Sequence, residues 1–239
     1  MIINILFVSV SYLAAVAATL AGFGSSTLLV PVAIHFMDVR TAVFIVACFH
    51  LFNNLFKIRL FWRKIDFKTF LLFGIPSIIF AFTGAFFISI LPVDIIKKVL
   101  GVFLIIYAIY SLIKPRFAIK KSKWTAIAGG SFSGLLAGLI GLGGAIRGAF
   151  LVTFNLAKEI YVGTSAAIAT VIDLTRIPTY IFTGAAREIE SYIILLLFLI
   201  VSAYFGVRTG KALLNRINQD TFRRIVSVAL FLVGIKILI

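Results

Sequence analysis

Charge is scarce in this sequence and unevenly placed. Charged residues make up 13% of its 239 positions, against roughly a quarter in a typical soluble domain. None precedes Asp38, and four later stretches lack them altogether: 69–93, 99–113, 124–146 and 191–207. A helix needs about 20 apolar residues to cross a bilayer. Runs of this kind exclude an ordinary soluble domain and predict an all-α polytopic membrane protein.

Acidic residues and cysteines are scarcer still. The sequence has 8 Asp and Glu residues and 23 Lys and Arg residues, which gives a net charge of +15. The basic residues gather in short segments between apolar runs, as at 57–68 and 114–123, which is the pattern of cytoplasmic loops. Nucleic acid is therefore not expected as a partner. Cys48 is the only cysteine, so an intramolecular disulfide is excluded.

Motifs for cofactors and metals are also missing. The chain has no phosphate-binding loop of the form G-x-x-x-x-G-K-[ST], so coupling to ATP would need a partner chain. It has two histidines and no grouping with metal-ligand spacing. We therefore expect no cofactor, no metal and no catalytic residues.

What the sequence does contain is a glycine-broken apolar segment that occurs twice. The copies read AGFGSSTLLVP and IGLGGAIRGAF, and Gly22 and Gly24 of the first lie 119 residues before Gly141 and Gly143 of the second. Glycine is costly inside a helix. Matching interruptions in two halves of a membrane protein indicate a transporter binding site near the middle of the bilayer.

The same offset of 119 residues aligns more than the glycines. It places Val43 on Val162 and Lys57 on Arg176, which indicates an internal duplication. The predicted organisation is a first repeat at 1–113, a basic cytoplasmic linker at 114–123 and a second repeat at 124–239.

Each repeat is predicted to hold one broken segment and three further helices. If each broken segment is a re-entrant hairpin, every half crosses the membrane three times and the halves are inverted. Hairpins place 16 basic residues inside and 5 outside, whereas single crossings give 12 and 9, so the positive-inside bias favours inverted hairpins. The broken segments are 3–37 and 124–156, and the other helices are 41–60, 69–90, 95–113, 161–183, 191–210 and 221–238.

Three motifs resemble one family of membrane proteins. They are G-x-G-S-S-x-L-L-V-P at 22–31, LAGLIGLGG at 136–144, and the helix openings TAV at 41–43 and VGTSA at 162–166. The chain resembles the TauE/SafE-type sulfite exporters along nearly its whole length. The resemblance implies transport of sulfite, a sulfonate or sulfoacetate across the cytoplasmic (inner) membrane. The chain departs from the family pattern in both copies, which leaves the substrate open. Ser25-Ser26 replaces family glycines in the first copy, and the second has Arg147 within its break and Phe150 in place of a usual proline.

The breaks suggest how an anion would bind. A helix that begins inside the membrane exposes unpaired N–H groups and the positive end of its dipole, which together favour anions. Ser25, Ser26 and Thr27 are good N-cap types whose hydroxyls can also donate to an oxyanion. The alternative is that the glycines only permit close helix packing. The substrate-binding candidates are Gly22, Gly24, Ser25, Ser26, Thr27, Gly141, Gly143, Gly144, Arg147, Arg176, Asn53 and Asn54.

Charged residues inside apolar runs are functional candidates. Arg147 follows the second break by one turn and is either a bidentate substrate contact or a structural partner. Asp173 and Arg176 share a helix face and form either an internal ion pair or, through Asp173, a proton carrier. His50 is the other proton-coupling candidate, with packing as its alternative. Asn53 and Asn54 would bind substrate or cap the hairpin.

These features together predict a secondary transporter that exports a small sulfur-containing anion, with proton coupling left open. An anion channel could use the same helix termini without alternating access. An intramembrane enzyme would use Ser25 or Ser26 with His50 as base, but the sequence lacks triad spacing. The expected partners are the anion and membrane lipids. The oligomeric state, monomer or homodimer, and the direction of transport remain open.

Overall fold

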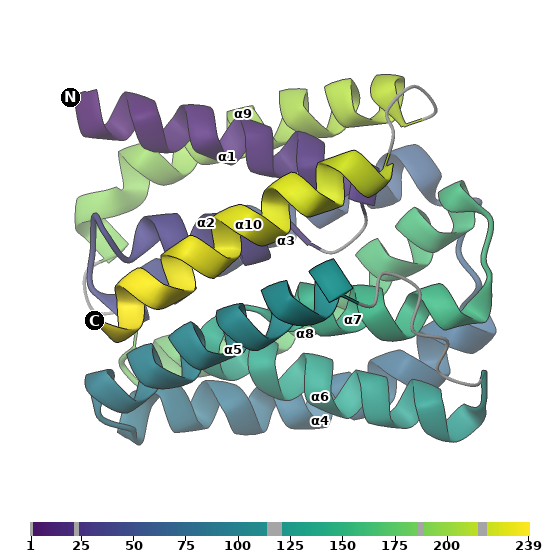
Figure 1. Cartoon of the computed structure of the whole chain (residues 1–239), viewed down its shortest axis with the longest axis horizontal. Coiled ribbons are helices and arrows are strands. Elements are labelled where there is room, and N and C mark those ends of the chain that lie inside the picture. The colour runs from purple at the N-terminus through teal and green to yellow at the C-terminus, as the bar shows by residue number, and fades with distance from the viewer. Residues whose placement is uncertain (1, 22–23, 114–120, 186–188, 215–218) are drawn as a thin grey trace.

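A computed structural model describes residues 2–21, 24–113, 121–185, 189–214 and 219–239, and all regular structure within these ranges is helical (Figure 1). This confirms the all-α prediction. Two short 3-10 turns, Val152–Phe154 and Ile189–Tyr192, accompany the α-helices. The α-helices are α1 (Ile2–Ala21), α2 (Ser26–Ala33), α3 (Val39–Phe61), α4 (Phe67–Ile90), α5 (Val93–Ile113), α6 (Lys123–Ile140), α7 (Gly143–Leu151), α8 (Lys158–Phe182), α9 (Ile193–Leu213) and α10 (Gln219–Leu238).

Five of the described helices are long and apolar enough to cross a membrane: α3, α4, α5, α8, and α9 together with the turn before it. Their outward faces carry large apolar side chains such as Phe82 and Leu197, which are more than half exposed. A bilayer is the solvent that accommodates such faces. The chain is therefore a multi-pass membrane protein, as predicted.

Local sequence sets where several of these helices begin. The Asp38 carboxylate accepts the Arg40 N–H at 2.9 Å and caps α3. The Asp66 carboxylate accepts the Thr69 N–H at 3.0 Å and caps α4. Caps of this kind satisfy N–H groups that the first helical turn leaves without partners.

Both predicted breaks are present. Gly24, with φ +86°, lies between α1 and α2, and Gly141, with φ +75°, ends α6. Positive φ is strained for residues with a side chain, which explains glycine at these positions. The amides of Gly141 and Leu142 bond back to the last turn of α6, the usual way a helix ends at a left-handed glycine. Each broken apolar segment is thus a long helix followed by a short one.

The two broken segments enter the bundle from opposite ends. In Figure 1, α1 starts at the left end of the molecule and α2 leads back to it, while α6 starts at the right end and α7 leads back there. The helices pair as α1 with α9, α6 with α4, α3 with α8, and α5 with α10. If each of the five helices of the first half is matched with its counterpart in the second (α1 with α6, α4 with α9, and so on), exchanging the two halves gives the same set of pairs. That the halves are inverted repeats stays a prediction.

Three glycines on one face of α6 let it pack closely on α4. A Cβ added to any of them would collide with the α4 backbone, and the Ser77 hydroxyl also donates to a carbonyl of α6, at 3.0 Å. Small residues allow this approach between membrane helices, so packing is the role of these glycines. They are Gly130, Gly134 and Gly138, which lie against the carbonyls of Phe73, Ser77 and Ala81.

One basic residue is not where the sequence placed it. Lys57 was assigned to a cytoplasmic loop at 57–68, but α3 continues to Phe61 and Lys57 is only 3% exposed. The assignment was wrong because the positive-inside rule concerns loop charges, whereas this side chain is enclosed by neighbouring helices. Of the predicted linker 114–123, only residues 121–123 lie within the described part.

Candidate anion-binding site

The two breaks meet near the centre of the bundle. A Cβ built on Gly24 would lie 3.1 Å from the Gly144 Cα, 3.2 Å from the His50 Nε2 and 3.4 Å from the Arg147 Nη2. Helices α2 and α7 are in contact as well. The beginnings of the two short helices, one from each half of the chain, therefore converge on one small region.

Neither short helix has a side-chain cap. Ser25, which precedes α2, has helical backbone angles (φ −67°, ψ −27°) and makes no capping hydrogen bond, and Leu142 precedes α7. Ser25 is a good N-cap type, but a capping residue usually has a non-helical backbone, and the Ser25 side chain does not cap α2. The buried Ser25 hydroxyl has no hydrogen-bond partner among the described residues. The beginnings of both helices thus carry no side-chain cap, and the positive ends of both dipoles point toward the junction.

Arg147 is the nearest charge to this junction. Its side chain is 2% exposed, and its Nε donates to the Ser165 Oγ of α8 at 2.9 Å. A guanidinium carries five N–H donors, and no ion pair to Arg147 is found among the described residues. It is therefore a buried cation without a neutralising partner.

A small cavity lies beside Arg147. Its volume is about 10 Å³, and its lining includes Gly24, Asn54, Lys57 and Ser165. A space of that size holds about one water molecule. An anion with several oxygens would therefore need the helices around the cavity to separate.

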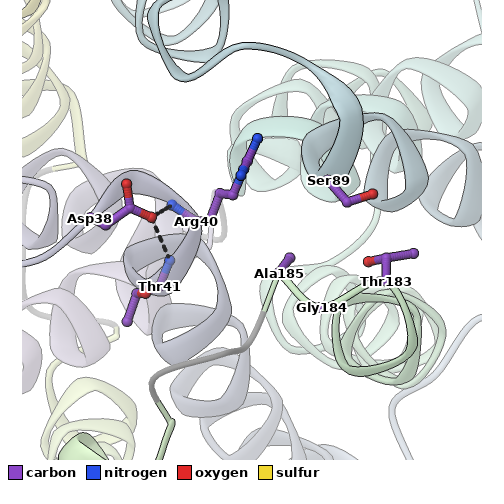
Figure 2. A pocket seen from close by; sticks show the side chains of 7 residues that line it. All are labelled: Asp38, Arg40, Thr41, Ser89, Thr183, Gly184 and Ala185. Carbon is purple, nitrogen blue, oxygen red and sulfur yellow. Dashed lines mark hydrogen bonds between the residues drawn. The ribbon is translucent and has the colours of Figure 1, made fainter.

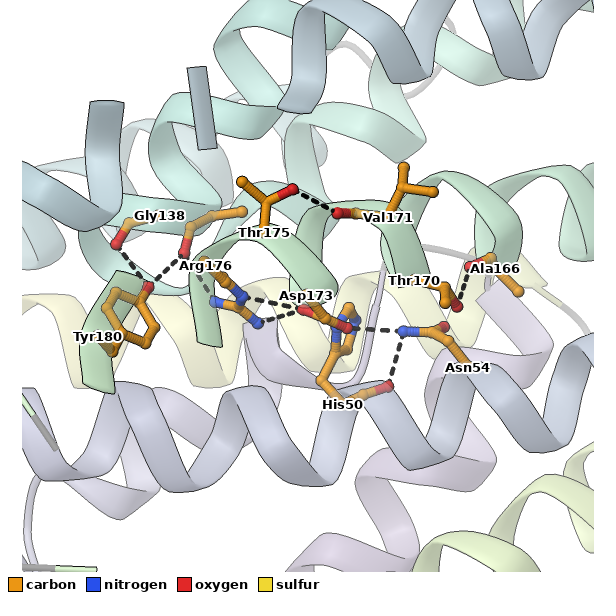
Figure 3. A network of polar contacts seen from close by, with 11 residues as sticks. His50, Asn54, Gly138, Ala166, Thr170, Val171, Asp173, Thr175, Arg176 and Tyr180 are labelled. Carbon is orange, nitrogen blue, oxygen red and sulfur yellow. Dashed lines mark hydrogen bonds and ion pairs between the residues drawn. The ribbon is translucent and has the colours of Figure 1, made fainter. Parts of the chain in front are cut away.

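Asp173 anchors a buried polar network next to the junction (Figure 3). Its carboxylate accepts from the Arg176 Nε at 2.9 Å and Nη2 at 2.8 Å, while the Arg176 Nη1 donates to the Ala137 carbonyl at 2.7 Å. Tyr180 adds a bond to the Gly138 carbonyl at 2.5 Å. Arg176 is therefore neutralised and ties α8 to the last turn of α6, as expected of an internal ion pair.

His50 connects this network to the junction. Its Nδ1 lies 2.7 Å from the Asp173 Oδ2, and its Nε2 faces Gly24 and has no partner among the described residues. The Asn54 Nδ2 also lies 3.1 Å from Nδ1, but the Asp173 contact is shorter and a carboxylate only accepts hydrogen bonds. We therefore assign the hydrogen to Nδ1, which leaves Nε2 of the neutral ring as an acceptor. His50 thus presents a lone pair, not a donor, to the place where an anion would bind.

Residues 7–237 match the family described as sulfite exporter TauE/SafE. The chain belongs to the sulfite exporter TauE/SafE family. This is a family of transporters, so the intramembrane-enzyme alternative is set aside. No curated protein matches the chain.

Other predicted site residues of this TauE/SafE protein have different surroundings. Gly143 packs against α6, where the Ser133 hydroxyl donates to its carbonyl at 2.8 Å and the Ser133 carbonyl leaves no room for a Cβ. Gly141 faces Val30 and Arg176. Asn53 is buried, and neither polar atom of its side chain has a partner among the described residues. Ser26 and Thr27 are buried in the first turn of α2, and Gly22 lies outside the described residues.

Two residues at the site were not predicted as ligands. Ser165 belongs to the VGTSA segment on which the family resemblance rests, but only its contact with Arg147 reveals a role. Lys57 lines the central cavity. A signal for Lys57 was present in the sequence, because the repeat alignment places it on Arg176.

Larger cavities lie toward both ends of α8. One of about 180 Å³ is bordered by Arg40, Ser89 and Thr183 (Figure 2). Another of about 170 Å³ is bordered by Lys158, and its lining also includes Val162, which lines the central cavity too. The central site of this TauE/SafE protein thus lies between two end cavities.

Proposed function

We propose that this protein is a secondary transporter that exports a small sulfur-containing oxyanion such as sulfite, a sulfonate or sulfoacetate. The observation that carries the proposal is the buried Arg147 guanidinium, placed beside two uncapped helix beginnings and lacking a carboxylate. A buried charge without a partner costs several kcal/mol. A bound oxyanion would neutralise Arg147 and accept hydrogen bonds from both helices, and the three oxygens of a sulfite or sulfonate group suit several converging donors.

Alternating access would proceed by movement of one half of the chain against the other. The entry of the two broken segments from opposite ends, and a helix pairing that survives exchange of the halves, support inverted repeats around a central site. The larger end cavities on either side of a narrow centre suit a site that opens to one side at a time. We place the protein in the cytoplasmic membrane, with the α3–α4 connection and the linker inside.

Proton coupling would run through His50 and Asp173. An anion next to the His50 Nε2 would meet an acceptor, whereas a proton on Nε2 turns that atom into a donor. The charged groups that face His50 are Asp173 and Arg176 from α8 and Arg147 from α7. A bound anion would offset the positive charge of Arg147 beside the ring. Anion and proton would therefore bind together and move in the same direction.

Flux measurements in proteoliposomes test this function. With the membrane potential held at zero, we expect sulfite flux that accelerates when a pH gradient drives protons in the same direction. Arg147→Gln should stop the flux, and Arg208→Gln, a change at an exposed arginine of α9, should leave it unchanged. Flux of equal rate with and without the pH gradient would instead indicate an anion channel.

A further inference from the structure

Lys57 is a second buried basic residue at the central cavity. It lies one turn before the end of α3, is 3% exposed, and lines the cavity together with Gly24 and Arg147. No hydrogen bond or ion pair of its ammonium group is found among the residues that the structure describes. Charged groups are almost never enclosed in this way unless they are paired, so Lys57 requires an explanation that helix packing does not supply.

Comparison of the two halves shows why Lys57 lacks a partner. The offset of 119 residues that places Lys57 on Arg176 also places Asn54 on Asp173. In the second half, the carboxylate neutralises the arginine three positions later. In the first half the corresponding side chain is a neutral amide, and its Nδ2 donates to the His50 carbonyl at 2.8 Å. One copy of the duplicated helix thus keeps its charge pair, and the other presents a lysine with no carboxylate three positions before it.

The charge balance around the cavity is therefore unequal. Arg147 and Lys57 both line it, and no acidic residue does. The nearby carboxylate, Asp173, is already engaged by Arg176 and His50. A singly charged ligand would neutralise one of the two cations and leave the other buried beside it. A ligand with two negative charges would neutralise both.

We infer that Lys57 sets the charge of the substrate, so that the site takes a small dianion in preference to a monoanion of the same size. This inference rests on the proposed function and specifies its substrate class. Arg147 would bind one oxyanion group through its planar fork, and Lys57 would meet the second negative charge as a point charge. Doubly ionised sulfite, or a short sulfonate that also bears a carboxylate, fits this arrangement. A zwitterion such as an aminosulfonate would bring an ammonium group toward a cation.

A matched pair of ligands tests the inference by calorimetric titration of the purified full chain. Sulfoacetate has a sulfonate and a carboxylate, and isethionate has the sulfonate with a neutral hydroxyl. In the unsubstituted protein we expect sulfoacetate to bind about thirtyfold tighter or more, the effect expected of one buried charge contact. Lys57→Met should reduce this ratio to about threefold or less while isethionate binding persists. Lys57→Arg keeps the charge and should retain the preference.

Arg59→Met is the control, since Arg59 lies two residues away on α3 and is exposed. It should leave the ratio unchanged. Equal affinity for the two anions in the unsubstituted protein would overturn the inference without any variant. A Lys57→Met protein that keeps the full preference, or that loses both anions equally, would also overturn it. If the unsubstituted protein binds none of sulfoacetate, isethionate and sulfite, the proposed function itself fails. That result differs from equal binding of sulfoacetate and isethionate, which overturns only the inference about Lys57.

Discussion

Gly24 and Gly144 approach each other so closely that a Cβ on Gly24 would lie 3.1 Å from the Gly144 Cα. They come from opposite halves of the chain: Gly24 lies just before α2, and Gly144 lies in the first turn of α7. The contact leaves no room for a side chain between the two helix beginnings. It also brings the beginnings of both helices close to the Arg147 guanidinium, which is the basis of the proposed anion site.

Gly24→Ala should abolish sulfite binding while the protein still inserts into the membrane. The new methyl group would face Gly144 and the Arg147 guanidinium, and φ +86° is unfavourable for alanine by about 1–3 kcal/mol. Thermal unfolding with and without sulfite measures binding, because a ligand of the folded state raises the midpoint. Gly74→Ala is the control, since a Cβ there would have contacts no closer than 3.7 Å. A normal sulfite shift in Gly24→Ala would refute a shared site.

His50→Gln should separate anion movement from proton movement. Glutamine retains polar atoms near Asp173 but cannot take up a proton at the site. We therefore expect the variant to exchange labelled sulfite across proteoliposome membranes and to lose accumulation driven by a pH gradient. Accumulation at the original level in His50→Gln would show that the proton follows another route.

Asp173→Asn should destabilise the protein by about 3–5 kcal/mol, because it leaves the buried Arg176 guanidinium without its counter-charge. Chemical unfolding in detergent measures the loss. Adding Arg176→Gln should recover part of the stability, since replacing both members of a buried pair removes the unpaired charge. If the double variant is less stable than Asp173→Asn alone, Arg176 contributes mainly through its bond to the Ala137 carbonyl.

Cysteine labelling tests the membrane topology. Lys158→Cys, at the exposed start of α8, should react with a membrane-impermeant reagent from the cytoplasmic side, and Lys97→Cys on α5 should react from outside. The native Cys48 is buried, so it gives little background. Reaction of position 158 from outside would contradict the hairpin arrangement and restore four crossings in each half.

The helix breaks could be predicted because their cause is local. A left-handed residue inside an apolar run calls for glycine, and Gly24 and Gly141 supply it at both breaks. The ion pair of Asp173 with Arg176 could be predicted for a similar reason, because residues three apart lie on the same helix face. Both features depend only on residue type and on spacing along the chain, so the sequence is sufficient to predict them.

The direction in which the remaining groups point could not be predicted, because it depends on packing between distant helices. Gly143 and Gly144 are adjacent, yet the first packs on α6 and the second faces Gly24. Ser25 is a good capping residue by type, but its backbone is already helical. Lys57 follows the loop-charge pattern in sequence and is nevertheless enclosed by the surrounding helices, which only the tertiary structure reveals.

Calorimetric titration of sulfite into the unsubstituted protein and into Arg147→Gln tests the central claim most directly. If Arg147 holds the anion between the two helix beginnings, the variant should bind at least about thirtyfold more weakly, as expected when one partner of a buried charge contact is removed. Arg147→Lys should recover only part of the affinity, because it loses the bidentate fork. Sulfite affinity in Arg147→Gln equal to that of the unsubstituted protein would contradict the account.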